Sequence, residues 1–195
     1  FGLVDAEVID AIRIEWPSGI VQELHDVAVN QILTVREQLL PIVNIPDSGL
    51  IAAIRDELEK PDGDITIKDM EALKGLNAQG QEIRSIEGLQ YATNLQVLIL
   101  SNNFLTSGAE FSLLQGLANL RRLVLNFNQL SSLNLPEGLT NLQVLEISDN
   151  PLTSLTLPAD LASLEGLIVE RNQVTALELP LSLPKLQQLN LGWNP

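Results

Sequence analysis

The stretch Leu142–Leu152, LQVLEISDNPL, decides the fold because four other segments repeat its frame. That frame reads L-x-x-L-x-L-x-x-N-x-L, where x is variable. The other copies are LQVLILSNNFL from Leu95, LRRLVLNFNQL from Leu120, LEGLIVERNQV from Leu164 and LQQLNLGWNP from Leu186. Their asparagines, which we call the asparagine ladder, are Asn103, Asn128, Asn150, Asn172 and Asn194, at intervals of 25, 22, 22 and 22 residues. A regular period of this length predicts a solenoid of stacked coils.

The segment L-x-L inside each copy alternates with period two, which predicts a short strand with both leucines facing inward. Stacked copies of such a strand form a parallel sheet. Each ladder asparagine has donors and an acceptor, so we expect it to bond backbone groups of its own and the neighbouring coil. A degenerate copy, LKGLNAQGQEI from Leu73, carries Gln81 in place of the asparagine, which gives about six coils.

This frame resembles the leucine-rich repeat family over residues 73–195, with the last repeat truncated. The fold class expected is α/β and β-rich, with a parallel sheet on the concave face of the solenoid. On the convex side, SSLNLPEGL from Ser131, TSLTLPADL from Thr153 and TALELPLSL from Thr175 each predict a short extended run that ends at proline. The repeat from Leu95 is three residues longer, so we expect a bulge or a helical turn on its convex side.

Residues 1–37 alternate apolar and polar positions on both sides of Pro17-Ser18-Gly19, which predicts two or three antiparallel strands. The run RIEWPSG followed by VQEL and NQILTV resembles the C-terminal half of the ASPIC/UnbV domain. That domain has earlier strands, and this chain begins at Phe1, so we expect a fragment of a longer protein in which more repeats follow. Residues 38–44 are interpreted as a connector.

Residues 45–72 predict a small helical cap for the repeat array. Asp47 or Ser48 is suited to begin a helix with an apolar stripe, and Lys60-Pro61-Asp62-Gly63 ends it. Thr66 followed by Asp69 is typical of a capping box at a second helix. The pair resembles the N-terminal cap that precedes bacterial leucine-rich repeat arrays, and its expected role is to cover the core of the first repeat.

Charge and residue types exclude several functions. The net charge is −14, which argues against nucleic acid and anionic membrane surfaces as partners, and the sequence has no apolar stretch long enough to insert in a bilayer. His25 is the only histidine and there is no cysteine, so neither a nucleophile–base pair nor a zinc pattern is present. Asp62-Gly63-Asp64 does not have the spacing of a calcium loop. We therefore expect no enzyme activity, no cofactor and no metal.

The predicted function is a binding module that recognises a protein or peptide on the concave face. Apolar side chains with aromatic anchors and a charged rim favour protein interfaces, whereas the alternative is that these residues only satisfy strand propensity. Two other interpretations stay open: a polysaccharide-binding or adhesion module, and a structural spacer attached to a propeller or an enzyme. Family resemblance alone implies an extracellular or cell-surface location. The candidate face comprises Val97, Ile99, Arg122, Val124, Phe127, Val144, Glu146, Ile168, Glu170, Asn190 and Trp193.

Overall fold

The computed structural model describes residues 8–16, 21–29, 31–36, 41–106 and 108–195. The chain divides into two compact units, residues 1–40 and residues 41–195.

The first unit contains an antiparallel pair of strands, β1 (Val8–Glu15) and β2 (Val21–Ala28), in which Ile12 lies opposite Leu24. The Trp16 indole at the end of this pair donates a hydrogen bond to the Gln22 side chain at 3.2 Å. The antiparallel pairing expected from the alternating sequence is therefore confirmed. The turn predicted at Pro17-Ser18-Gly19 lies outside the described residues.

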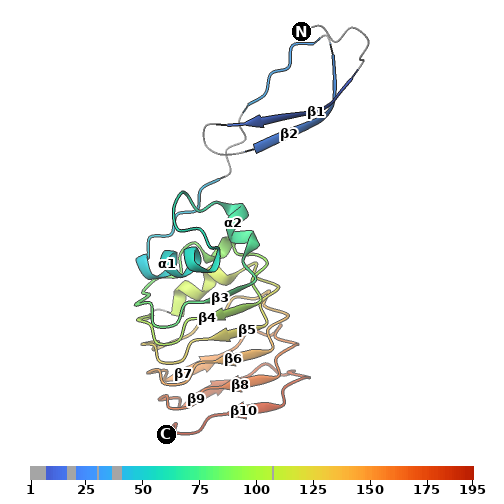
Figure 1. The fold of residues 1–195 in the computed structure, drawn as a ribbon. Helices are drawn as coiled ribbons and strands as arrows, with labels where there is room; N and C mark the ends of the chain where they lie inside the picture. The colour runs from blue at the N-terminus through green and yellow to red at the C-terminus, as the bar shows by residue number, and fades with distance from the viewer. Residues whose placement is uncertain (1–7, 17–20, 30, 37–40, 107) are drawn as a thin grey trace. The chain divides into compact units, whose positions relative to one another are not determined.

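The second unit is a solenoid built on a six-stranded parallel sheet with the order β10-β8-β6-β5-β4-β3 (Figure 1). Each strand is three residues long and comes from one coil, so the fold class predicted from the leucine frame is confirmed. The middle residue of every strand is a leucine in register with the next, and from β3 to β8 these leucines are buried. The strands are β3 (Gly75–Asn77), β4 (Val97–Ile99), β5 (Arg122–Val124), β6 (Val144–Glu146), β8 (Gly166–Ile168) and β10 (Gln188–Asn190).

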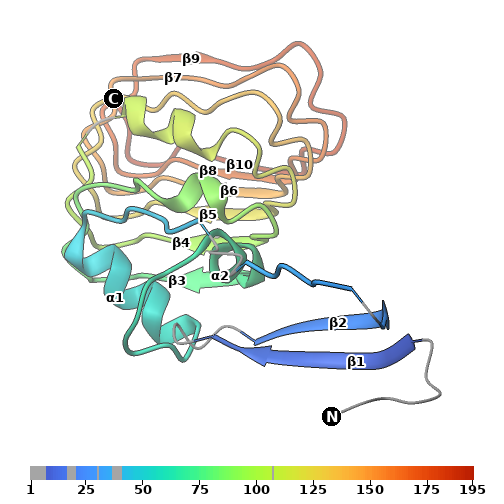
Figure 2. The same ribbon diagram turned by 90° about the horizontal axis from the view of Figure 1, so that it is seen from above.

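Two short strands, β7 (Ser154–Thr156) and β9 (Ala176–Glu178), pair in parallel away from the six-stranded sheet (Figure 2). They correspond to the extended runs expected on the convex side. Two 3-10 helices occupy earlier coils, η1 (Leu89–Tyr91) and η2 (Gly108–Leu114), and η2 is the helical turn expected in the longer repeat.

The extended run expected from Ser131 is not a strand in the structure. Its backbone lies beside η2, and a Cβ on Gly108 would lie 2.3 Å from the Ser132 carbonyl oxygen. A helical neighbour offers no ladder of strand hydrogen bonds. Pairing on this side of the solenoid begins one coil later, with β7 and β9.

Two helices lie over the first coil of the sheet, α1 (Ser48–Glu57) and α2 (Ile67–Ala72) (Figure 1). Asp47 begins α1, because its Oδ1 accepts from the Gly49 and Leu50 amides, both at 3.0 Å. Its Oδ2 accepts from the Arg84 and Ser85 amides at 2.8 Å and 3.2 Å, which joins the helix to the first repeat. A Cβ on Gly49 would lie 1.9 Å from the Gln81 carbonyl oxygen, so the close approach of α1 requires glycine.

The second cap helix begins with the capping box expected at Thr66 and Asp69. The Asp69 amide donates to Thr66 Oγ1 at 3.2 Å, and the Thr66 amide donates to Asp69 Oδ2 at 2.7 Å. Lys60 also reaches this carboxylate at 2.8 Å. Apolar side chains of both helices, including Leu50, Ile54 and Met70, are fully buried and join the core of the repeats.

Candidate binding face

The strand register sets which side chains share the outer surface of the six-stranded sheet. Residues on either side of each inward leucine point away from the core, because side chains alternate along a strand. We call the outward residues of the six strands, together with the residue that lies two positions after each strand, the sheet face. Its central row is Asn77, Ile99, Val124, Glu146, Ile168 and Asn190, and its first flanking row is Gly75, Val97, Arg122, Val144, Gly166 and Gln188.

The apolar part of the sheet face is only half open to solvent. Val97, Ile99, Val144 and Ile168 are half-buried, whereas Val124 is 5% exposed. Glu146 lies beside Val124 in the register, and it accepts a hydrogen bond from Arg122 at 2.6 Å and one from Asn126 at 3.2 Å. Arg122 and Asn126 flank Val124 along the chain. Together with Glu146, these two polar side chains surround Val124.

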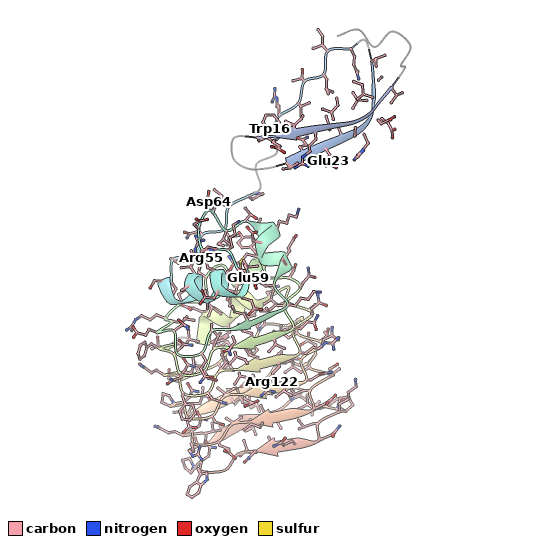
Figure 3. All side chains as sticks on the ribbon, viewed as in Figure 1. Trp16, Glu23, Arg55, Glu59, Asp64 and Arg122 are labelled. Atoms are coloured by element: carbon pink, nitrogen blue, oxygen red, sulfur yellow. The ribbon has the colours of Figure 1, made fainter. Side chains whose placement is uncertain are left out.

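A pocket of about 320 Å³ lies on the sheet face over β4 and β5. Its wall combines aliphatic side chains, amide and hydroxyl groups, one guanidinium and one aromatic ring. Figure 3 shows Arg122 on the sheet, where its side chain is half exposed. The pocket is lined by Gln79, Ile99, Ser101, Arg122, Val124, Asn126 and Phe127.

The residue before each ladder asparagine has a left-handed backbone, and so does Gly80, which precedes Gln81 in the degenerate first copy. Glycine, asparagine and aspartate tolerate this conformation well, whereas bulky side chains are strained in it. Phe127 and Trp193 nevertheless occupy it, and they are 56% and 81% exposed. Sequence reasoning placed both aromatic residues at the strand ends but missed this strain, because φ is not visible in the repeat frame. We call this row the turn row: Gly80 (φ 69°), Asn102 (58°), Phe127 (57°), Asp149 (57°), Arg171 (49°) and Trp193 (63°).

Charged side chains gather around β6 and β8, partly on the sheet face and partly in the turn row. Arg122 pairs with Glu146, and Arg171 pairs with Asp149 at 3.3 Å. Glu170 accepts a hydrogen bond from the Asn190 amide, and its own backbone amide donates to Ser148 Oγ at 3.1 Å. Charged and apolar groups therefore lie next to each other on this surface.

The asparagine ladder lies at the edge of the sheet and joins each coil to the one before it. Asn150 is typical: its Oδ1 accepts from the Leu130 amide at 3.0 Å and its Nδ2 donates to the Leu125 carbonyl at 3.0 Å. Asn103, Asn128, Asn172 and Asn194 each accept from an amide of the preceding coil and donate to a carbonyl of that coil in the same way. From Asn103 to Asn172 these side chains are buried, so the bonds satisfy backbone groups that water does not reach.

A second row of asparagines was missed by sequence reasoning. Asn94, Asn119 and Asn141 each donate through Nδ2 to a carbonyl of the preceding coil, at 2.8 Å, 3.0 Å and 2.8 Å. Each precedes the first leucine of its repeat frame, and that constant position was the available signal. These side chains are exposed, in contrast to the asparagine ladder.

Two residues considered for chemistry from the sequence, His25 and Asp64, belong to elements other than the six-stranded sheet. The His25 side chain is 63% exposed in β2. Arg55 donates to the Lys60 and Gly63 carbonyls at 3.1 Å and 2.7 Å, and Figure 3 shows it in the cap region with Asp64. Within the part of the chain that the structure describes, no group of three or more His, Cys, Asp or Glu residues is placed to hold a metal ion. Among those same residues, no helix has the length and apolarity needed to cross a bilayer.

Comparison with known families identifies both sequence resemblances. Residues 93–137 and 118–163 match the family described as Leucine Rich repeats (2 copies), and residues 1–39 match ASPIC and UnbV. The resemblances drawn from the leucine frame and from the N-terminal run are therefore confirmed. Leucine-rich repeats support a protein-interaction module as the general class of this chain. No curated protein sequence matches the chain.

Several solved structures resemble this one. A Clostridium perfringens ZmpB structure, with CBM51-2 in complex with GlcNAc and INT domains, is 33% identical over 46% of this chain, with a TM-score of 0.39. This chain covers 18% of that ZmpB chain. An internalin C2 from Listeria monocytogenes is 25% identical, with 78% of this chain and 86% of that chain covered and a TM-score of 0.40. A Listeria monocytogenes internalin, inlF, is 23% identical, with 80% and 79% covered and a TM-score of 0.39.

Proposed function

We propose that this chain is a non-catalytic binding module whose sheet face holds a protein or peptide segment. The proposed organisation is a partial ASPIC/UnbV unit at 1–37, a connector at 38–44, a helical cap at 45–72 and the repeats at 73–195. The proposed setting is a secreted or cell-surface bacterial protein, in keeping with the two family resemblances. No cofactor or metal takes part.

The observation that carries this proposal is the pocket over β4 and β5. It places the aliphatic side chain of Ile99 and the exposed ring of Phe127 beside the guanidinium of Arg122. Aromatic residues and arginine are enriched where protein interfaces concentrate their binding energy. The strain of Phe127 supports the same assignment, because a strained bulky residue with little burial contributes poorly to folding.

A polysaccharide ligand is the second candidate. Trp193 is 81% exposed, and Asn190, in the strand just before it, has its amide directed to Glu170. An open aromatic ring near amide and carboxylate groups suits the apolar and hydroxyl faces of a sugar. A glycan array probed with the same protein separates this candidate from peptide recognition.

The test is selection of a phage-displayed library of random dodecapeptides on the immobilised protein. We expect enriched peptides to bind the wild type and to lose binding to the double variant Ile99→Glu with Ile168→Glu. The matched control is Ser132→Glu with Ala176→Glu, which adds the same charge at exposed positions outside the sheet face. Peptides that bind the sheet-face variant as well as the wild type, or the absence of any enrichment, would contradict the proposal.

A further inference from the structure

The carboxylates of the sheet face and turn row differ in how their charge is balanced. Glu146 has Arg122 at 2.6 Å, and Asp149 has Arg171 at 3.3 Å. Glu170 has no cationic side chain within ion-pair distance among the residues that the structure describes. Its Oε1 accepts from a neutral amide, that of Asn190. One negative charge of this surface is therefore left without an opposite charge.

The Glu170 side chain is held in place and remains accessible. Its Oε1 is fixed by Asn190, and its backbone amide is fixed by Ser148 Oγ at 3.1 Å. The next position in the same row is Gly192, which has no side chain to cover the carboxylate. Glu170 is half-buried, and a carboxylate that is partly removed from water is stabilised by a cation more than a fully solvated one is.

The charge of the whole chain favours a cationic partner. Acidic residues number 25 against 11 basic residues, for a net charge of −14. A field of that sign attracts positively charged segments and repels acidic ones. We propose, resting on the function proposed above, that the segment bound on the sheet face carries a lysine or arginine side chain that pairs with Glu170.

The geometry of the sheet also sets a spacing within that segment. Ile99 lies on β4 and Glu170 follows β8, three strands away in the sheet order β8-β6-β5-β4. Three strand separations of about 4.8 Å, with about 7 Å along the strand, give about 16 Å between the two positions. An extended peptide rises about 3.3 Å per residue, so its cationic residue lies about five positions from the apolar residue that contacts Ile99.

The experiment repeats the random dodecapeptide selection on three forms of the full chain: wild type, Glu170→Gln and Glu178→Gln. Glu178 lies on β9, away from the six-stranded sheet, so its change removes the same charge elsewhere. We expect lysine or arginine at one position of the peptides enriched on the wild type and on Glu178→Gln, but not on Glu170→Gln. For the most enriched synthetic peptide, Glu170→Gln raises the Kd about fivefold, the upper range for an exposed ion pair, and added salt reduces the difference.

The possible outcomes separate this inference from the function on which it rests. Peptides that depend on Ile99 but show no preference for a cationic residue overturn the pairing with Glu170 and leave sheet-face binding in place. A cationic preference that persists in Glu170→Gln also overturns the pairing. Failure to enrich any peptide that depends on Ile99 overturns the function proposed above, and this inference with it.

Discussion

At the scale of single residues, Phe127 tests whether the turn row serves folding or binding. Its backbone is left-handed (φ 57°) and its ring is 56% exposed. Asparagine tolerates this conformation better, so Phe127→Asn is expected to raise the free energy of unfolding by about 1 kcal/mol. Urea denaturation measures the change. The reverse exchange one strand earlier, Asn102→Phe, is expected to lower stability by a similar amount, and a loss of stability in Phe127→Asn would contradict the strain argument.

Asn150 tests the asparagine ladder. Its side chain is 5% exposed and bonds the Leu130 amide and the Leu125 carbonyl of the preceding coil. Asn150→Ala leaves these buried groups without partners, so the free energy of unfolding should fall by about 1–3 kcal/mol. The exposed Asn141 bonds the Ala118 carbonyl, and Asn141→Ala is the control, with a smaller expected loss because water replaces its bond.

Some features of single residues were predictable from the sequence and others were not. Even spacing was sufficient to predict bonds between the asparagine ladder and neighbouring coils. The burial of Val124 was not predictable, since it depends on Arg122 and Asn126 both reaching Glu146. Side-chain contacts of that kind follow from rotamers and not from a repeat frame. The lack of a cationic partner for Glu170 could not be predicted either, because it also depends on side-chain rotamers.

At the scale of single strands, burial decides how much each leucine contributes. Leu145 in β6 is 0% exposed, whereas Leu189 in β10 is 45% exposed. Leu145→Ala is expected to reduce the free energy of unfolding by about 2–5 kcal/mol through lost burial and the cavity left behind. The same change at Leu189 should cost much less. Equal losses in chemical denaturation of the two variants would show that the strand register is wrong.

The capping box of α2 predicts a pH dependence of stability. Burial raises the pKa of Asp69, but hydrogen bonds from Lys60 and Thr66 outweigh it and hold the pKa below the ordinary value of 3.8. A lowered pKa in the folded state gives stability that is present above 3.8 and lost as the pH falls through the folded pKa. We expect the difference in free energy of unfolding between wild type and Asp69→Asn to shrink below pH 3.8, in urea titrations at several pH values.

Some strands and helices could be predicted from the sequence and others could not. The strands of the six-stranded sheet were predictable because each carries the same inward leucine, and α2 was predictable because its capping box is local. The run from Ser131 has the same alternation as β7 but is not a strand, and its neighbour in the preceding coil is the helix η2, which offers no strand to pair with. A strand depends on its neighbour as well as on its own sequence.

At the scale of the whole molecule, the core of the second unit is a single cluster among the residues that the structure describes. The cluster is apolar and extends from Val43, just before the cap, to Val174 near β9. A fragment of residues 41–195 is therefore expected to unfold cooperatively at the same temperature as the full chain, within a few degrees. Scanning calorimetry checks this. A large drop in the unfolding temperature would show that residues 1–40 contribute to the stability of the repeats.

The hydrogen bonds of the asparagine ladder between coils all run in one direction, from a side chain to the backbone of the preceding coil. The Asn172 side chain accepts a hydrogen bond from the Leu152 amide and donates one to the Ile147 carbonyl, both of which precede it in the chain. The Asn150 side chain bonds Leu130 and Leu125 in the same manner. Each turn from Gln81 to Asn172 thus relies on an asparagine side chain supplied by the next coil along the chain. When the coil beyond β8 unfolds, the preceding coil loses its asparagine hydrogen bonds and becomes easier to unfold in turn. At the opposite end, Asp47 of the cap accepts a hydrogen bond from the Arg84 amide of the first repeat. Fraying of this array is accordingly expected to proceed in one direction, towards the cap.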